Sequence, residues 1–112
     1  MTINLDYASE KMTSAIRALA TSSASLQDRL SFVCKRDFHT LDRGGILPTK
    51  EFKERFSDIV TRLTANPIPG SNAGSLQDTL SQMDNREAEA IAEAIFDLYR
   101  EIESHRMEGS HL

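Results

Sequence analysis

Cysteine is almost absent from this 112-residue chain, and tryptophan is absent altogether. With Cys34 as the single cysteine no internal disulfide can form, which excludes a secreted fold held together by disulfides. Phenylalanine and tyrosine together make up only 6% of the residues. The hydrophobic core must therefore be mainly aliphatic, with the five phenylalanines as its large side chains.

The chain also lacks any long apolar run. No segment approaches the ~20 apolar residues that a membrane-spanning helix needs. The first residues, Met1 to Tyr7, carry neither the basic nor the apolar region of a signal peptide, which predicts a cytoplasmic protein. A hydrophobic content of 39% and a charged content of 27% are typical of a folded globular protein. We expect one helical domain over residues 1–108 and a flexible tail over residues 109–112.

Motifs for catalysis or metal binding are missing too. The residues around His39 include Cys34 and Asp37, but no pair of them has the spacing of a zinc site. Cys34 falls on the apolar side of a helical pattern, where no base is positioned to activate its thiol. Arg43-Gly44-Gly45 follows no strand and lacks the spacing of a phosphate-binding loop. We therefore predict no catalytic residue, no metal and no cofactor, and a protein that is not an enzyme.

The longest helical pattern runs from Asp84 to about Met107. Asp84 followed by Glu87 three residues later is typical of a capping box at a helix start. No glycine or proline interrupts the pattern before Gly109, which allows about six turns at ~3.6 residues per turn. Its apolar residues recur at spacings of three and four, which predicts one buried stripe made of Ala88, Ile91, Ala92, Ile95, Leu98, Tyr99 and Ile102.

Three further helices are predicted upstream of this one. The first has a cap at Asn4 or Asp6 and runs to about Ala20, the second starts at Ser25, and the third runs from a cap at Thr49 to about Thr64. The short polar link after Ala20 favours an antiparallel pairing of the first two helices. Segments rich in glycine and proline, 42–48 and 66–74, separate the later elements.

A short helix or turn is expected at Ser75-Leu-Gln-Asp78, which repeats the letters of Ser25-Leu-Gln-Asp28. The residues that follow the two segments share no pattern, so we do not interpret them as a duplication. We interpret each of them instead as a helix start in which the serine side chain caps the first turn.

These elements predict an all-α fold, a small helical bundle of about four helices with a long C-terminal helix. Its aliphatic core is expected to include Phe38, Phe52, Phe56 and Phe96. The last helix is expected to extend beyond the cover of the other helices. Because an uncovered apolar stripe is usually buried by a second copy, we predict a homodimer.

Charge is distributed unevenly along the chain, whose formal net charge is −4. Residues 29–62 hold eight Lys and Arg against five acids, a net charge of +3, whereas residues 78–112 hold nine acids against three arginines, a net charge of −6. The last helix carries a set of acids at every fourth position that we call the acidic ridge: Glu89, Glu93, Asp97 and Glu101. Like charges at this spacing destabilise a helix by roughly 0.2–0.5 kcal/mol per pair. The ridge is either a solvated face that keeps the protein soluble, or a docking surface for a basic partner or for the basic middle of a second subunit.

Two functional hypotheses follow. The first is a small cytoplasmic protein–protein interaction module, such as an adaptor, chaperone or inhibitor, that docks a basic partner through helix faces. Its binding residues would be the acidic ridge and Phe32, which falls opposite the apolar side of the second helix. The alternative is a dimeric DNA-associated transcriptional regulator that uses the basic segment 29–62, with contacts from Lys35, Arg36, Arg43, Lys50 and Lys53.

Nucleic-acid binding is the weaker of the two hypotheses. The connection between the second and third helices spans about seven residues, against the ~3–4 of a helix-turn-helix motif. Three acids on the exposed face of the third helix, Glu51, Glu54 and Asp58, would meet phosphates unfavourably.

Overall fold

The computed structural model describes residues 3–41 and 49–109, and every regular element in these ranges is a helix. The predicted all-α fold with a long C-terminal helix is confirmed. The elements are α1 (Ile3–Thr21), α2 (Leu26–Val33), the π-helical segment η1 (Cys34–Phe38), α3 (His39–Leu41), α4 (Lys50–Leu63), α5 (Ser75–Gln82) and α6 (Asn85–Gly109). The predicted break at residues 42–48 and the last three residues of the predicted tail lie outside the described residues.

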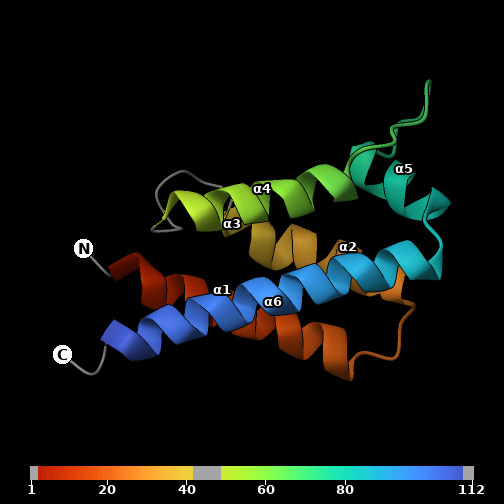
Figure 1. The fold of residues 1–112 in the computed structure, drawn as a ribbon. Helices are drawn as coiled ribbons and strands as arrows, with labels where there is room; N and C mark the ends of the chain where they lie inside the picture. The colour runs from red at the N-terminus through yellow and green to blue at the C-terminus, as the bar shows by residue number, and fades with distance from the viewer. Residues whose placement is uncertain (1–2, 42–48, 110–112) are drawn as a thin grey trace.

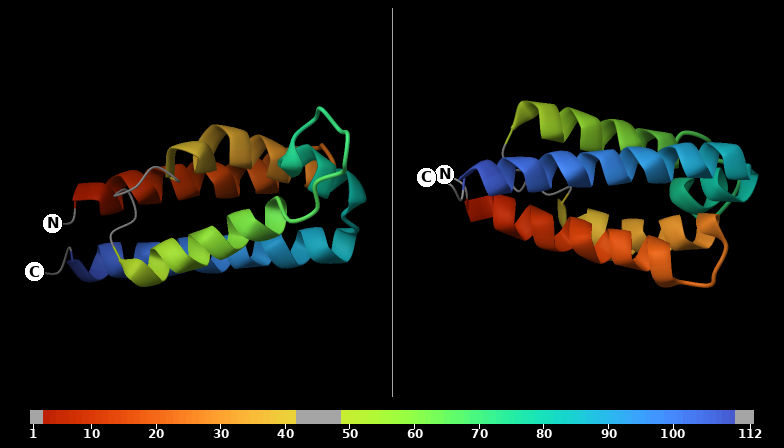
Figure 2. Two further views of the ribbon diagram at one scale, coloured as in Figure 1. Left: turned by 90° about the horizontal axis from the view of Figure 1, so that it is seen from above. Right: turned by 60° about the horizontal axis from the view of Figure 1, so that its bottom comes forward.

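Four long elements run up and down in an antiparallel bundle (Figure 1). The second of them is continuous, since α2, η1 and α3 follow one another without a gap. Seen from above, α1 and this composite helix lie on one side, and α4 and α6 lie on the other (Figure 2). The short helix α5 closes the end of the bundle opposite to the two chain termini (Figures 1 and 2).

Three of the predicted helix caps are confirmed. The amide of Asp28 donates a hydrogen bond to Ser25 Oγ at 3.1 Å, and the start of α4 is closed by Thr49 in the same way. The amide of Glu87 donates to the carboxylate of Asp84 at 2.8 Å. Each of these side chains satisfies one of the backbone donors that a helix start leaves unpaired. The prediction of a cap at Asn4 or Asp6 is wrong, because α1 already includes Ile3.

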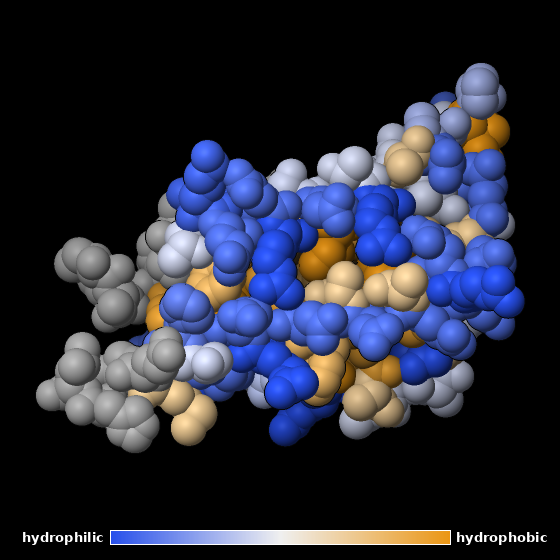
Figure 3. Space-filling view, in the orientation of Figure 1, coloured by the Kyte–Doolittle hydropathy of each residue, from blue (hydrophilic) through white to orange (hydrophobic). Residues whose placement is uncertain are grey.

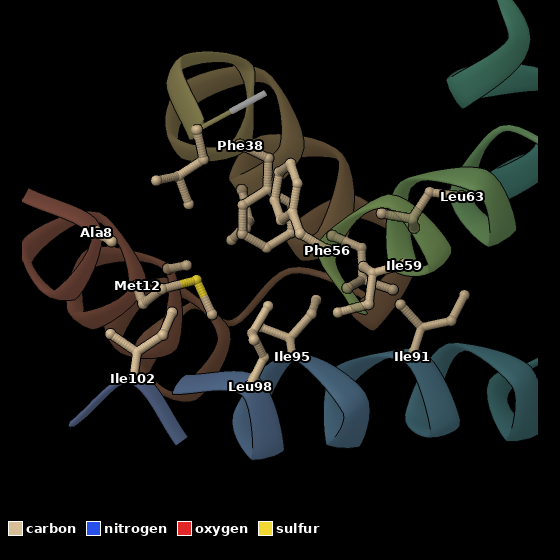
Figure 4. Packing of buried hydrophobic residues seen from close by; sticks show 14 of the residues in the cluster. Ala8, Met12, Phe38, Phe56, Ile59, Leu63, Ile91, Ile95, Leu98 and Ile102 are labelled. Carbon is tan, nitrogen blue, oxygen red and sulfur yellow. The ribbon is translucent and has the colours of Figure 1, made fainter. Parts of the chain in front are cut away.

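The core lies along the apolar stripe of α6. Ala88, Ile91, Ile95, Leu98 and Ile102 are all fully buried. In Figure 4 the stripe points toward side chains from the other helices, which include Ala8, Met12, Phe56 and Ile59. Above it the rings of Phe38 and Phe56 meet edge to face, with their centroids 5.2 Å apart. Burial of each large apolar side chain contributes roughly 1.5–3 kcal/mol to folding.

Phe96 does not belong to this core, which corrects the sequence-based prediction. Its side chain is 43% exposed and leans on Tyr99, with ring centroids 6.1 Å apart. The reason is helical geometry: Phe96 follows the buried Ile95 directly, and adjacent residues on a helix point in different directions. The other three predicted aromatic core residues, Phe38, Phe52 and Phe56, are buried.

The overhang predicted for the end of α6 is also absent from the described residues. Ile102 is fully buried, and the ring of His105 meets the ring of Phe52 edge to face at 5.1 Å. Arg106 then pairs with Asp6 of α1 at 3.6 Å and with Glu103 at 3.2 Å. The hydrogen bond and negative charge of Glu103 raise the pKa of Arg106. The apolar stripe is thus covered within one chain. The homodimer remains a prediction, but the uncovered stripe on which it was based is absent from the described residues.

The π-helical segment brings a charged group into the interior beside the core. The amide of His39 donates to the carbonyl of Cys34, five residues back, which widens this turn relative to an α-helix. Asp37 and Phe38 are consequently both buried, at 1% and 2% exposure. The Asp37 carboxylate accepts hydrogen bonds from the Arg36 side chain, the shortest being 2.9 Å from Nη2.

Candidate protein-binding surfaces

The acidic ridge lies on the solvent side of α6. All four of its carboxylates are exposed, and none forms an ion pair with a residue in the described ranges. Glu103 and Arg106, three residues apart on α6, form an ion pair, whereas Asp97 and Arg100 at the same spacing form none within the described structure. A row of hydrophilic side chains is visible along α6 in Figure 3.

The ridge is not electrostatically uniform along its length. Its C-terminal half borders α4, where an open hollow of about 440 Å³ is lined by Arg55 and Arg100 together with Asp97 and Glu101. A second hollow of about 340 Å³ shares Arg55 and Asp97 with it and also has the apolar residues Ile59 and Ala94 in its lining. Two arginines therefore offset part of the negative charge at the C-terminal half.

Phe96 lies beside the middle of the ridge, three residues after Glu93, directly before Asp97 and one turn before Arg100. Positions three and four residues apart are neighbours on a helix surface. The half-exposed Phe96 ring therefore adds an apolar contact area to an otherwise charged surface. Sequence reasoning missed this role because it placed Phe96 in the core.

Phe32 lies on a different face of the molecule, where its side chain is 50% exposed. It lines an open groove of about 460 Å³ between α1 and α2. The guanidinium of Arg36 covers the ring, with the Cζ atom 4.4 Å from the ring centroid. Arg17 and Arg29 also line the groove, opposed by a single acid, Asp28. The sequence predicts that Phe32 belongs to a binding surface. In the structure, Arg36 lies over its ring, and Arg17 and Arg29 line the same groove.

No protein-family model, curated protein or solved structure matches this chain. In the part of the chain that the structure describes, no group of three or more His, Cys, Asp or Glu side chains could hold a metal ion. Within the same residues, no helix is long and apolar enough to cross a membrane.

The residues chosen for the nucleic-acid alternative do not form one free basic face. Lys35 and Lys53 are exposed, but Arg36 is paired with Asp37 and also donates to the backbone and hydroxyl oxygens of Ser14. Lys50 lies 3.8 Å from Glu54. The remaining candidate, Arg43, lies outside the described residues.

The sequence analysis missed Arg17 and Arg29 as candidate binding residues. Arg17 is isolated in a helix with mixed charge, and Arg29 was counted only in the net charge of the basic segment. The signal that points to them is helical spacing. Arg29 lies three residues before Phe32 and Arg36 lies four after it, so all three share one side of the helix.

Proposed function

We propose that the chain is a protein–protein interaction module, of the adaptor, chaperone or inhibitor kind, that docks a basic partner on the acidic ridge. The observation that carries this proposal is the unbalanced charge of the ridge. Its four exposed carboxylates follow one another at i,i+4 along a helix whose opposite face is buried in the core. Selection for stability alone favours opposite charges at this spacing, because each like-charged pair costs roughly 0.2–0.5 kcal/mol.

The ridge has the composition of a surface that recognises a partner by charge and anchors it by apolar contact. Carboxylates in water contribute mainly to the rate and specificity of association, since exposed ion pairs are worth little in affinity. Aromatic side chains supply more of the binding energy at interfaces. Phe96, beside Glu93, is positioned to serve as such an anchor.

The test is affinity capture from a nuclease-treated lysate of the native host, with the wild type beside the double variant Glu93→Lys/Asp97→Lys. The proposal expects a basic protein that the wild type retains and this variant loses. The matched control is Glu10→Lys/Glu51→Lys, which changes the net charge equally at exposed positions outside the ridge. This control should retain the same protein.

A further variant in the same experiment distinguishes specific recognition of the ridge from an effect of net charge. The variant Phe96→Ala leaves every carboxylate in place and should weaken retention of the captured protein. Equal loss in the ridge variant and in the control would mean that net charge alone governs capture. In that case, or if the wild type captures nothing, the ridge is only a solvated face and the proposal fails.

A further inference from the structure

The groove between α1 and α2 is lined by side chains from both helices. Arg17, Ala18 and Thr21 line one side, and Arg29, Phe32 and Arg36 line the other. Arg17 and Ala18 lie four and three residues before Thr21, and Arg29 and Arg36 lie three residues before and four after Phe32, which are the spacings of neighbours on one side of a helix. The groove extends for about two turns, or roughly 10 Å at a rise of about 1.5 Å per residue. Two antiparallel helices with a trough between them can accept a third helix as ridges pack into grooves.

Two of the arginines are held in place before any ligand arrives. Arg29 donates through Nη1 to the carbonyl of Leu19 at 2.6 Å and through Nε to the carbonyl of Ala24 at 2.9 Å. Arg36 is held by Asp37 and by Ser14, whose carbonyl and hydroxyl oxygens accept from Nη2. Side chains fixed in this way lose less conformational entropy when they bind a ligand.

Donor capacity remains on all three arginines. A guanidinium carries five N–H donors, and the contacts above use only some of them. In the described structure Nη1 of Arg36 and Nη2 of Arg29 have no hydrogen-bond partner, and the same is true of the whole guanidinium of Arg17. These groups can bind carboxylates, for which the guanidinium fork has the matching geometry.

We propose that the α1–α2 groove is a docking site for an acidic amphipathic helix of a partner protein. Carboxylates of the partner pair with Arg17, Arg29 and Arg36, and one large apolar side chain rests on Phe32 and Ala18. Charge complementarity selects the acidic class, since the three arginines exceed the two acids beside them, Asp28 in the lining and Asp37, which pairs with Arg36. The half-exposed phenylalanine favours a peptide over a nucleic-acid backbone, because a ligand that carries only phosphates would leave the Phe32 ring uncovered.

This site is separate from the acidic ridge and does not rest on the function proposed for it. The groove lies on α1 and α2, and the ridge lies on α6. The groove takes a ligand of the opposite charge. Failure of either proposal therefore leaves the other standing.

The experiment is a fluorescence-anisotropy titration of the full chain against a labelled synthetic helix of about 18 residues, with leucine at heptad positions a and d, glutamate at e and g, and alanine elsewhere. We expect saturable binding that Arg17→Glu weakens by about tenfold or more, because the variant places like charges together. Lys53→Glu makes the same change in net charge at an exposed site outside the groove and should bind as the wild type does. Phe32→Ala should weaken binding by about tenfold, and Phe96→Ala, the other exposed phenylalanine, should not.

Changes in the peptide test the same contacts without altering the protein. Replacement of glutamate by glutamine, or of leucine by serine, should each abolish binding to the wild type. The proposal is overturned if the acidic helix does not bind, or if Arg17→Glu and Lys53→Glu weaken it equally. It is also overturned if the chain self-associates and both Arg17→Glu and Glu93→Lys abolish that association, since the occupant would then be the acidic ridge of a second copy.

Discussion

The backbone amide of Ile68 donates a 2.9 Å hydrogen bond to the carboxylate of Asp78, ten residues further along the chain. Ser71 Oγ donates to the other oxygen of the same carboxylate at 2.6 Å. Asp78 lies in α5 and is 5% exposed, so a buried charge organises the connection between α4 and α5. The amide of Asn66 donates to Thr79 Oγ1 at 2.8 Å and fixes the start of this loop. A loop rich in glycine and proline is thereby held in one shape.

Asp78→Ala should destabilise the protein by about 1–3 kcal/mol, because it removes the acceptor for the Ile68 amide and for Ser71. Amide hydrogen exchange in residues 66–73 should accelerate by more than that in the bundle helices. Urea unfolding measures the first effect and exchange detected by mass spectrometry measures the second. Asp58→Ala, at an exposed position of α4, is the control and should change stability by less than about 0.5 kcal/mol. An unchanged exchange rate in the loop would show that Asp78 does not hold it.

Ile95 and Phe96 are adjacent in sequence and should respond in opposite ways to truncation. Ile95 is fully buried, so Ile95→Ala should cost about 2–5 kcal/mol by loss of apolar burial and creation of a cavity. Phe96→Ala should cost about 1 kcal/mol or less, because the ring is 43% exposed. Chemical denaturation of both variants tests the register of α6. A larger loss from Phe96→Ala would place Phe96 in the core and contradict the structure.

The Arg36–Asp37 pair should matter more than an ordinary surface ion pair. Asp37 is 1% exposed and Arg36 connects it to Ser14 of α1, so Asp37→Ala leaves Arg36 without its anion. We expect a loss of about 1–3 kcal/mol, below the value for a fully buried pair because 42% of the Arg36 side chain is exposed to water. Thermal unfolding of Asp37→Ala beside Glu54→Ala measures it. Glu54 forms only the exposed pair with Lys50 and should cost about 0.5 kcal/mol or less.

Duplex DNA should bind the chain weakly or not at all at physiological salt. The alternative hypothesis of a DNA-associated regulator requires phosphate contacts from Lys35, Lys53 and their neighbours, and such contacts make affinity fall steeply with added salt. A fluorescence titration with labelled duplex at several salt concentrations measures both affinity and slope. Tight binding that Lys35→Glu/Lys53→Glu abolishes would favour the regulator hypothesis over the interaction module.

The final helix and the three confirmed helix caps could be predicted because their causes are local. A stripe of apolar residues at helical spacing, a side chain that caps the first turn and a proline–glycine loop all act within a few residues of one another. The same reasoning placed Phe32 opposite the apolar side of the second helix, but only the structure showed that no other element in the described residues covers this side and that Phe32 is 50% exposed.

The repeated Ser-Leu-Gln-Asp segments show that a helix cap cannot always be predicted from a few neighbouring residues. Ser25 accepts a hydrogen bond from the amide of Asp28 and caps α2 as expected. The interpretation of Ser75 as a second cap is wrong, because α5 includes Ser75 and its N-cap is Gly74, which has no side chain to accept a bond. Asp78 instead reaches back to the loop that precedes it. The two segments with the same sequence form different hydrogen bonds, because different unpaired backbone donors lie near each of them.

The sequence by itself determined the helical class, the positions of most helix starts, the buried stripe of α6 and the uneven distribution of charge. Each of these depends on spacing along one helix or on composition. Only the tertiary structure decided that α6 is covered to its last turns, that Arg17, Arg29 and Phe32 share a groove, and that Asp37 and Asp78 are buried with partners. These features depend on which helices lie side by side, and the partners come from segments whose proximity is set by packing of the whole core.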